Sequence, residues 1–231
     1  MKNTETIQVE RKATHVTKAI LLVLTMLSCF QLTYGSGTNE VVVPNYGDKY
    51  SNFVKQLEAG QTNINYREFR ESFLASEQFR NSPKQKPDLG TLRKRMHELM
   101  QESKYAEIIA VAKQMLSIDY TDMEAHKILQ QTYKILGDAA NRNKYHDIEF
   151  GLLNSIVKNG DGKTCQTAWP VIQITEEYFI LQMLGARLLR QSVDNSGGLC
   201  DKMEVQTNEG NKTYFFEVSK LFKGEKKEGL R

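Results

Sequence analysis

The segment Gly160-Asp-Gly-Lys-Thr164 contains the residue types that hold phosphate in nucleotide-binding loops. In such loops backbone N–H groups and one lysine bind the phosphate, which makes Asp161 and Lys163 candidates for a small-ligand site. The full motif needs a glycine five residues before the second glycine of this segment, and Val157 stands there. A calcium loop fails similarly, because Ala168 occupies the position of the last carboxylate ligand. We therefore expect an exposed turn.

The other residues suited to acid–base or metal chemistry are scattered along the chain. His146-Asp147 lies beside Glu149, and His126 belongs to a preceding helical segment that could fold back on them. Glu176-Glu177 stands where we predict a helix start, and the helix dipole explains acidic residues there. No serine lies in a Gly-x-Ser-x-Gly elbow. The sequence therefore predicts no catalytic residue, no metal site and no cofactor, which favours a protein that is not an enzyme.

Cys165 and Cys200 are two of the three cysteines of the chain. In an oxidising compartment they could form a disulfide, to which the chain-entropy model assigns roughly 4 kcal/mol. Two unpaired buried thiols are the alternative. The sequence leaves both readings open.

The first 35 residues resemble a secretory signal peptide. Lys2, Arg11 and Lys12 precede a short apolar run, and small residues follow at a cut after Gly35. As a helix this run spans only about 20 Å, against roughly 30 Å for a membrane core, so we predict no permanent membrane span. Cleavage and lipidation at Cys29 is the alternative. We expect an exported bacterial protein that is periplasmic, secreted or envelope-associated.

The remaining chain divides by composition into four segments. We expect a linker over 36–60, a helical region over 61–158, a β-rich region over 159–220 and a charged tail over 221–231. A net charge of +3 with 26% charged residues is ordinary for a soluble protein. This balance gives no basic stripe with stacking aromatics, so we predict no nucleic-acid partner.

Apolar residues in the helical region recur at the spacing of one helix face. A helix is predicted over Tyr66–Ala75, and two prolines predict a break in the segment Asn81–Asp88. Thr121 and Glu124 form a capping-box pattern, and Gly137 stands where the next helix should end. Short turns between such helices predict antiparallel hairpins.

The segment Ala125–Asp138 resembles the first helix and turn of a tetratricopeptide repeat, with leucine, tyrosine and glycine at that repeat's packing and turn positions. Stacked hairpins of this kind form a concave groove, which implies a protein or peptide partner. The polar residues that we expect to face the groove are Arg95, His126, Gln130, Gln131 and Lys134.

After Gly160 the composition changes toward β-structure. We predict a strand over Trp169–Ile174, a short helix over Thr175–Gly185 with threonine as its N-cap, and further strands. These strands cover Ala186–Val193, Lys202–Thr207 and Thr213–Ser219, with turns between them. The fold class is therefore α+β, with tetratricopeptide-like antiparallel helical hairpins followed by a small antiparallel sheet.

The chain also resembles a family of exported Bacteroides-type proteins known as domain of unknown function 4919. The resemblance is carried by seven short matches: Lys104–Glu107, Asp138, Gly151–Ile156, Gly160–Lys163, Glu176–Tyr178, Gln191-Ser192 and Tyr214–Phe216. It implies a helical half and a small β half, and it implies no activity or ligand. Function is therefore predicted from the residues alone: a protein- or peptide-interaction module of the cell envelope. The alternative is an unrecognised enzyme or small-ligand binder with a site near Gly160–Lys163.

Overall fold

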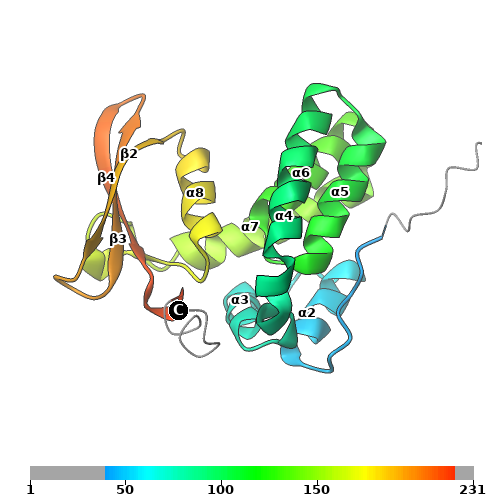
Figure 1. Ribbon diagram of the computed structural model, residues 1–231, viewed down its shortest axis with the longest axis horizontal. Helices are drawn as coiled ribbons and strands as arrows, with labels where there is room; N and C mark the ends of the chain where they lie inside the picture. The colour runs from blue at the N-terminus through cyan, green and yellow to red at the C-terminus, as the bar shows by residue number, and fades with distance from the viewer. Residues whose placement is uncertain (1–39, 222–231) are drawn as a thin grey trace, which may run out of the picture. The chain divides into compact units, whose positions relative to one another are not determined.

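The computed structural model describes residues 40–221, apart from the side chains of residues 82–83 and 85–87, and its helices come first (Figure 1). These helices are α2 (Lys49–Glu58), α3 (Tyr66–Leu74), α4 (Glu77–Gln101), α5 (Tyr105–Ile118), α6 (Met123–Ile135) and α7 (Ala139–Val157). The predicted signal peptide, Cys29 and nearly all of the predicted tail lie outside the described residues. Within 40–221, no helix combines the length and the apolar character that crossing a membrane requires.

Consecutive helices from α4 to α7 pack against each other, as the amphipathic pattern predicts (Figure 1). The turn between α6 and α7 contains Gly137, whose φ of 75° lies in the left-handed region that favours glycine. An aromatic cluster binds α2 and α3 to this bundle, with Tyr50, Phe69 and Phe73 almost fully buried. The Tyr50 hydroxyl also accepts a hydrogen bond from the backbone N–H of Tyr120 at 2.9 Å.

Three predictions about the helices need correction. Helix α4 continues through residues 81–88, because a proline removes one backbone hydrogen bond while the helix keeps its packing against α5. Asp122 rather than Thr121 caps α6, since its carboxylate accepts from the N–H of Ala125. The segment 36–60, where we expected a linker, contains the core-forming helix α2.

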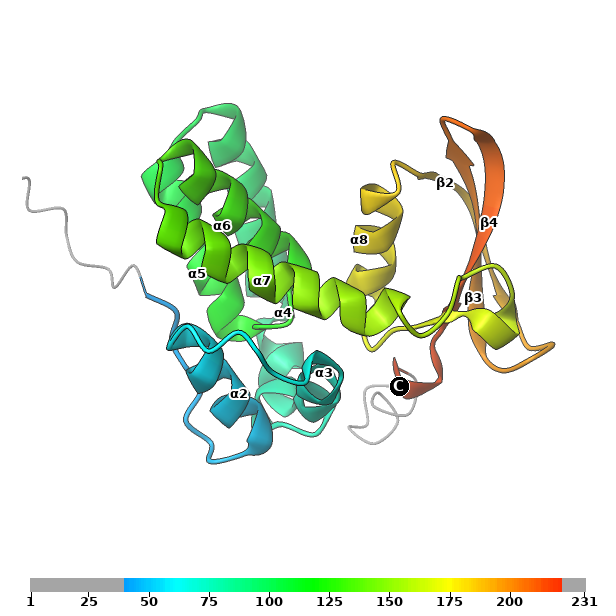
Figure 2. The same cartoon turned by 180° about the vertical axis from the view of Figure 1, so that it is seen from behind.

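The second part of the chain forms a four-stranded sheet with one covering helix. Its elements are β1 (Trp169–Pro170), α8 (Ile174–Met183), β2 (Arg187–Asp194), β3 (Cys200–Thr207) and β4 (Gly210–Glu217). The strand order is β1-β4-β3-β2. Figures 1 and 2 show α8 between the sheet and the helices, and α8 contacts both α6 and β2. The α+β fold class is confirmed, with helices first and strands at the C-terminal side.

The sheet is mixed rather than antiparallel, because β1 runs parallel to β4 and pairs Trp169 with Phe216. The strand that we predicted over Trp169–Ile174 is also shorter than expected, because β1 covers only Trp169 and Pro170. Pro170 has no N–H to donate to a ladder, and Gln173 already serves as the N-cap of α8. Helix α8 begins at Ile174, one residue before Thr175, so the predicted role of Thr175 as N-cap was wrong.

Cys165 and Cys200 are joined in a disulfide, with their Cα atoms 5.8 Å apart. The bridge connects the short 3₁₀ helix Cys165–Thr167, which precedes β1, to the first residue of β3. It packs with Ala168 and Phe215 in a small buried cluster. Of the two readings left open by the sequence, the disulfide is the one that the structure contains.

Candidate binding cleft

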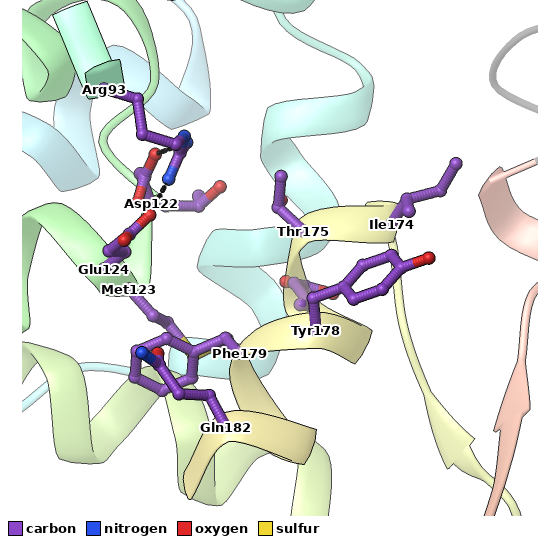
Figure 3. A pocket seen from close by; sticks show the side chains of 11 residues that line it. Arg93, Asp122, Met123, Glu124, Ile174, Thr175, Tyr178, Phe179 and Gln182 are labelled. Carbon is purple, nitrogen blue, oxygen red and sulfur yellow. Dashed lines mark hydrogen bonds and ion pairs between the residues drawn. The ribbon is translucent and has the colours of Figure 1, made fainter. Parts of the chain in front are cut away.

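A cleft of about 430 Å³ opens between the start of α6 and the start of α8 (Figure 3). Arg93 of α4 closes one side. The remaining lining residues come from the start of α6 and from α8: Thr121, Asp122, Met123, Glu124, Ile174, Thr175, Glu176, Tyr178, Phe179 and Gln182. Two chain segments that lie far apart in the sequence therefore form one concave surface.

The charged rim of the cleft is held by the cap of α6. One oxygen of Asp122 accepts from the N–H of Ala125 at 3.1 Å, and the other accepts from Arg93 at 2.6 Å. Arg93 also forms an ion pair with Glu124, and Figure 3 shows the guanidinium between the two carboxylates. The guanidinium is thereby fixed in place by both acidic side chains.

Glu176, which lines the cleft, forms a buried ion pair with Arg70 of α3. Both side chains are only 3% exposed, and two N–H groups of Arg70 donate to the carboxylate at 2.6 and 2.8 Å. Arg70 also donates to the Pro170 carbonyl at 3.2 Å and to the Ser155 hydroxyl at 3.3 Å. One Glu176 oxygen accepts a further bond from the N–H of Ile172 at 2.8 Å. The pair therefore joins α3, α7 and the start of α8.

The first turns of α8 give the cleft its apolar surface. Ile174 and Tyr178 are 48% and 46% exposed, and their spacing of four residues places them on one side of the helix. Phe179 and Met123 are buried and lie next to each other at the base (Figure 3). Ile174 and Tyr178 therefore give the rim of the cleft exposed apolar surface, and Figure 3 shows both side chains directed away from Arg93 and Asp122.

Glu177 is buried on the side of α8 that faces the sheet. Its carboxyl group is inaccessible to solvent, and neither oxygen has a hydrogen-bond partner in the structure. Burial raises its pKa to about 8, and the negative charges of Asp201 and Glu176 add to the increase. At neutral pH this carboxyl group is therefore mainly protonated.

The wild-type protein is expected to lose stability as pH rises, because Glu177 must then ionise while buried. The variant Glu177→Gln should not show this loss. The folded pKa of about 8 exceeds the ordinary value of 4.5, so the folded state binds the proton more tightly than the unfolded chain. The stabilisation is complete below pH 4.5 and is lost as pH rises to 8. Urea unfolding at pH 5 and pH 8.5 should show similar stability at the lower pH and a gain on the order of 4 kcal/mol for the variant at the higher pH. Parallel profiles for the two proteins would contradict the burial of an ionisable carboxyl group.

The residues predicted to face a helical groove do not all come together. Gln130 and Lys134 line a shallow depression of about 270 Å³, which they share with Arg142, Asn143 and His146 of α7. Gln131 is exposed on α6, and Arg95 is exposed on α4, where it pairs with Glu98. Neither lines this depression.

His126 does not face a groove, and this part of the prediction was wrong. The ring is fully buried and lies 2.8 Å from the Tyr120 carbonyl through Nε2, and burial lowers its pKa to about 4. The reason is helix periodicity, because His126 shares the buried face of α6 with Leu129 and Tyr133.

The loop containing Asp161 and Lys163 uses its own hydrogen-bond donors. The N–H of Gly162 donates to the Thr167 carbonyl at 3.0 Å, and the N–H of Lys163 donates to Asp161 at 3.1 Å. The Trp169 ring lies so close to Gly162 that a side chain there would collide with it. These N–H groups therefore hold the turn and are not directed outward toward a phosphate.

In the described part of the chain, no group of three or more His, Cys, Asp or Glu side chains is placed to hold a metal ion. His146 and Asp147 form an exposed pair at 3.2 Å on the surface of α7. Glu149 lies on the same helix and does not belong to that pair.

Comparison with known proteins identifies a family. Residues 40–227 match a family model described as domain of unknown function DUF4919. No curated protein and no solved structure matches the chain.

Proposed function

We propose that this chain, which belongs to the DUF4919 family, is an exported interaction protein of the bacterial envelope whose α6–α8 cleft binds a protein or peptide. An apolar side chain of the partner packs against Ile174 and Tyr178 at the rim of this cleft. The likeness of α6 and its turn to a tetratricopeptide repeat is part of this proposal, because such hairpins commonly bind other chains.

The observation that carries the proposal is the state of the charged groups around the cleft. Asp122 and Glu124 both form ion pairs with Arg93, and Glu176 forms one with Arg70. A general acid or base must be able to exchange a proton with a substrate, whereas these groups are held in ion pairs. Exposed apolar side chains beside fixed charges suit the binding of a partner surface better than catalysis.

A second surface is supported by a separate observation. Phe150 of α7 is 57% exposed and stacks on His146 with a ring-centre distance of 6.0 Å. It adjoins the depression lined by Gln130, Lys134 and Arg142. Aromatic and arginine side chains are enriched where partners bind, so this α6–α7 surface is the second candidate.

Export is supported by the apolar segment near the N-terminus and by the disulfide, because disulfides persist in oxidising compartments. Release after Gly35 and lipidation at Cys29 differ in one consequence. Release leaves the cleft free to reach a soluble partner, whereas a lipid restricts it to a membrane surface.

Partner capture from the native cell envelope tests the cleft. We expect one stoichiometric partner with the wild-type full chain and at least about ten-fold weaker capture with Ile174→Ser/Tyr178→Ser, since burying two apolar side chains contributes more than about 1.4 kcal/mol. Val42→Ser is the matched control, because Val42 is 65% exposed and lies outside the cleft. Equal capture by all three proteins would contradict the cleft. Loss of capture only with Gln130→Ala/Lys134→Ala would assign the partner to the α6–α7 surface.

A further inference from the structure

Strand β2 is an open edge of the sheet along its whole length, and β4 is paired with β1 only at Phe216 and Glu217. The order β1-β4-β3-β2 places β1 and β2 at the two edges. Strand β1 is only two residues long and includes Pro170, which cannot donate a ladder hydrogen bond. Strand β2 spans eight residues, and over the described residues only β3 pairs with it. Its outer N–H and C=O groups are therefore available to another strand.

The side chains of β2 do not protect this edge fully. Leu189 is 47% exposed and Val193 is 56% exposed. Charged residues and bulges usually keep an edge strand from pairing with a neighbour. Here the two arginines of the strand are balanced by only one acidic residue, Asp194, at its far end. A partner strand that pairs with β2 must therefore place an apolar residue near Leu189 or Val193. It must also place an acidic residue opposite an arginine and a basic residue opposite Asp194.

A bulge fixes which face each side chain of β2 occupies. Leu188 pairs with Val205 and Arg190 pairs with Glu204, so Leu189 is an extra residue with no partner in β3. Counting from the β3 register, one face carries Arg187, Arg190, Ser192 and Asp194. The other face carries Leu188, Gln191 and Val193, together with the buried residues Met203 and Val205 of β3.

We propose that β2 pairs antiparallel with β2 of a second copy of this chain, about a twofold axis at Gln191. With Leu189 bulged in both strands, Gln191 lies opposite itself, Arg190 opposite Ser192, and Leu188 opposite Val193. Arg187 then lies opposite Asp194, and symmetry repeats this pair on the other side of the axis. Every pair joins residues on the same face, as strand pairing requires.

Two features of β2 select this register over its neighbours. An axis at Arg190 would place two arginines directly opposite each other, which is destabilising. An axis at Ser192 would leave Arg187 and Leu188 without partners. The axis at Gln191 uses the whole strand and places opposite charges at both ends. Over the described residues, the two sheets then form one continuous eight-stranded sheet, with β1 and the part of β4 that β1 leaves unpaired at each outer side.

Charge exchange across the axis tests the pairing. We expect the wild-type full chain to sediment as a dimer, and we expect Arg187→Glu or Asp194→Lys alone to weaken the dimer at least about ten-fold, because each places like charges opposite each other. Mixing the two variants in equal amounts should restore the dimer, since the acidic side chain introduced in one chain then lies opposite the basic side chain introduced in the other. Circular dichroism of each variant checks that the fold is kept.

Cross-linking tests the register. Directly paired Cα atoms lie about 4.5–5.5 Å apart, so Gln191→Cys should give a covalent dimer under oxidation. Val193→Cys is the matched control, because its two copies would lie roughly 13 Å apart.

Four outcomes would overturn the proposal. The wild-type protein could be a monomer at about 100 μM, or the charge variants could leave the dimer unchanged. The mixture of the two variants could fail to restore the dimer, or both cysteine variants could cross-link equally. None of these outcomes depends on the α6–α8 cleft.

Discussion

Replacing Arg70 with alanine is expected to lower the free energy of unfolding by about 3–5 kcal/mol, because it leaves the buried carboxylate of Glu176 without a counter-charge. The Arg70 guanidinium donates to that carboxylate and to the Pro170 carbonyl. Its removal therefore leaves the Glu176 carboxylate without its counter-charge, with only the N–H of Ile172 still donating to it, in a site that water hardly reaches. Urea unfolding at pH 7 gives the change directly.

Arg67→Ala is the matched control on the same helix. Arg67 pairs with Glu71 at 3.2 Å, but the two side chains are 60% and 42% exposed, so the loss should stay below about 0.5 kcal/mol. The double variant Arg70→Met/Glu176→Met should recover much of the stability lost in Arg70→Ala, because it removes both buried charges together. Equal losses for Arg67→Ala and Arg70→Ala would mean that the pair is not buried in solution.

The buried pair also shows why the sequence could not predict the cleft. Arg70 and Glu176 are separated by 106 positions, and no local pattern connects an arginine in one helix to an acidic residue in a later one. The two glutamates at 176 and 177 were explained by the helix dipole. The structure gives them different environments, since one is paired and the other is buried without a partner.

Local signals were reliable where one helix face or one turn determines the structure. The apolar spacing predicted α3 to within one residue of its observed end. Gly137 lies in the left-handed region at the end of α6, as its position after the apolar run suggested. The turn clusters predicted the loops between β2, β3 and β4 in the same way.

Errors arose where packing outweighed a local preference. The prolines predicted a break, yet the packing of α4 against α5 favours one continuous helix. For His126 the necessary signal was present in the sequence, because Leu129 and Tyr133 follow it at three and seven positions. Its polar type was given more weight than its spacing. Parallel pairing of β1 with β4 depends on residues 47 positions apart and had no local signal.

Removing the disulfide is expected to destabilise the protein by roughly 4 kcal/mol. The bridge closes a loop with a sequence separation of 35, and in the chain-entropy model such a loop restricts the unfolded chain by about that amount. The loss should affect the sheet most, because Cys200 begins β3 and is fully buried. Urea unfolding of Cys165→Ala/Cys200→Ala and of the chemically reduced wild-type protein measures it, and the two should agree.

Single variants and reduction of the wild type separate two causes of this loss: opening of the disulfide loop and replacement of two buried side chains. If the bridge itself provides the stability, Cys165→Ala alone should lose nearly as much as the double variant, because either change opens the loop. If burial of the side chains provides it, the two single losses should add up to the double loss, and reduction of the wild type should cost much less. Intact mass gives an independent check, since the oxidised chain should weigh about 2 Da less than the reduced one. An unchanged mass together with unchanged stability on reduction would show that Cys165 and Cys200 are two separate thiols in solution.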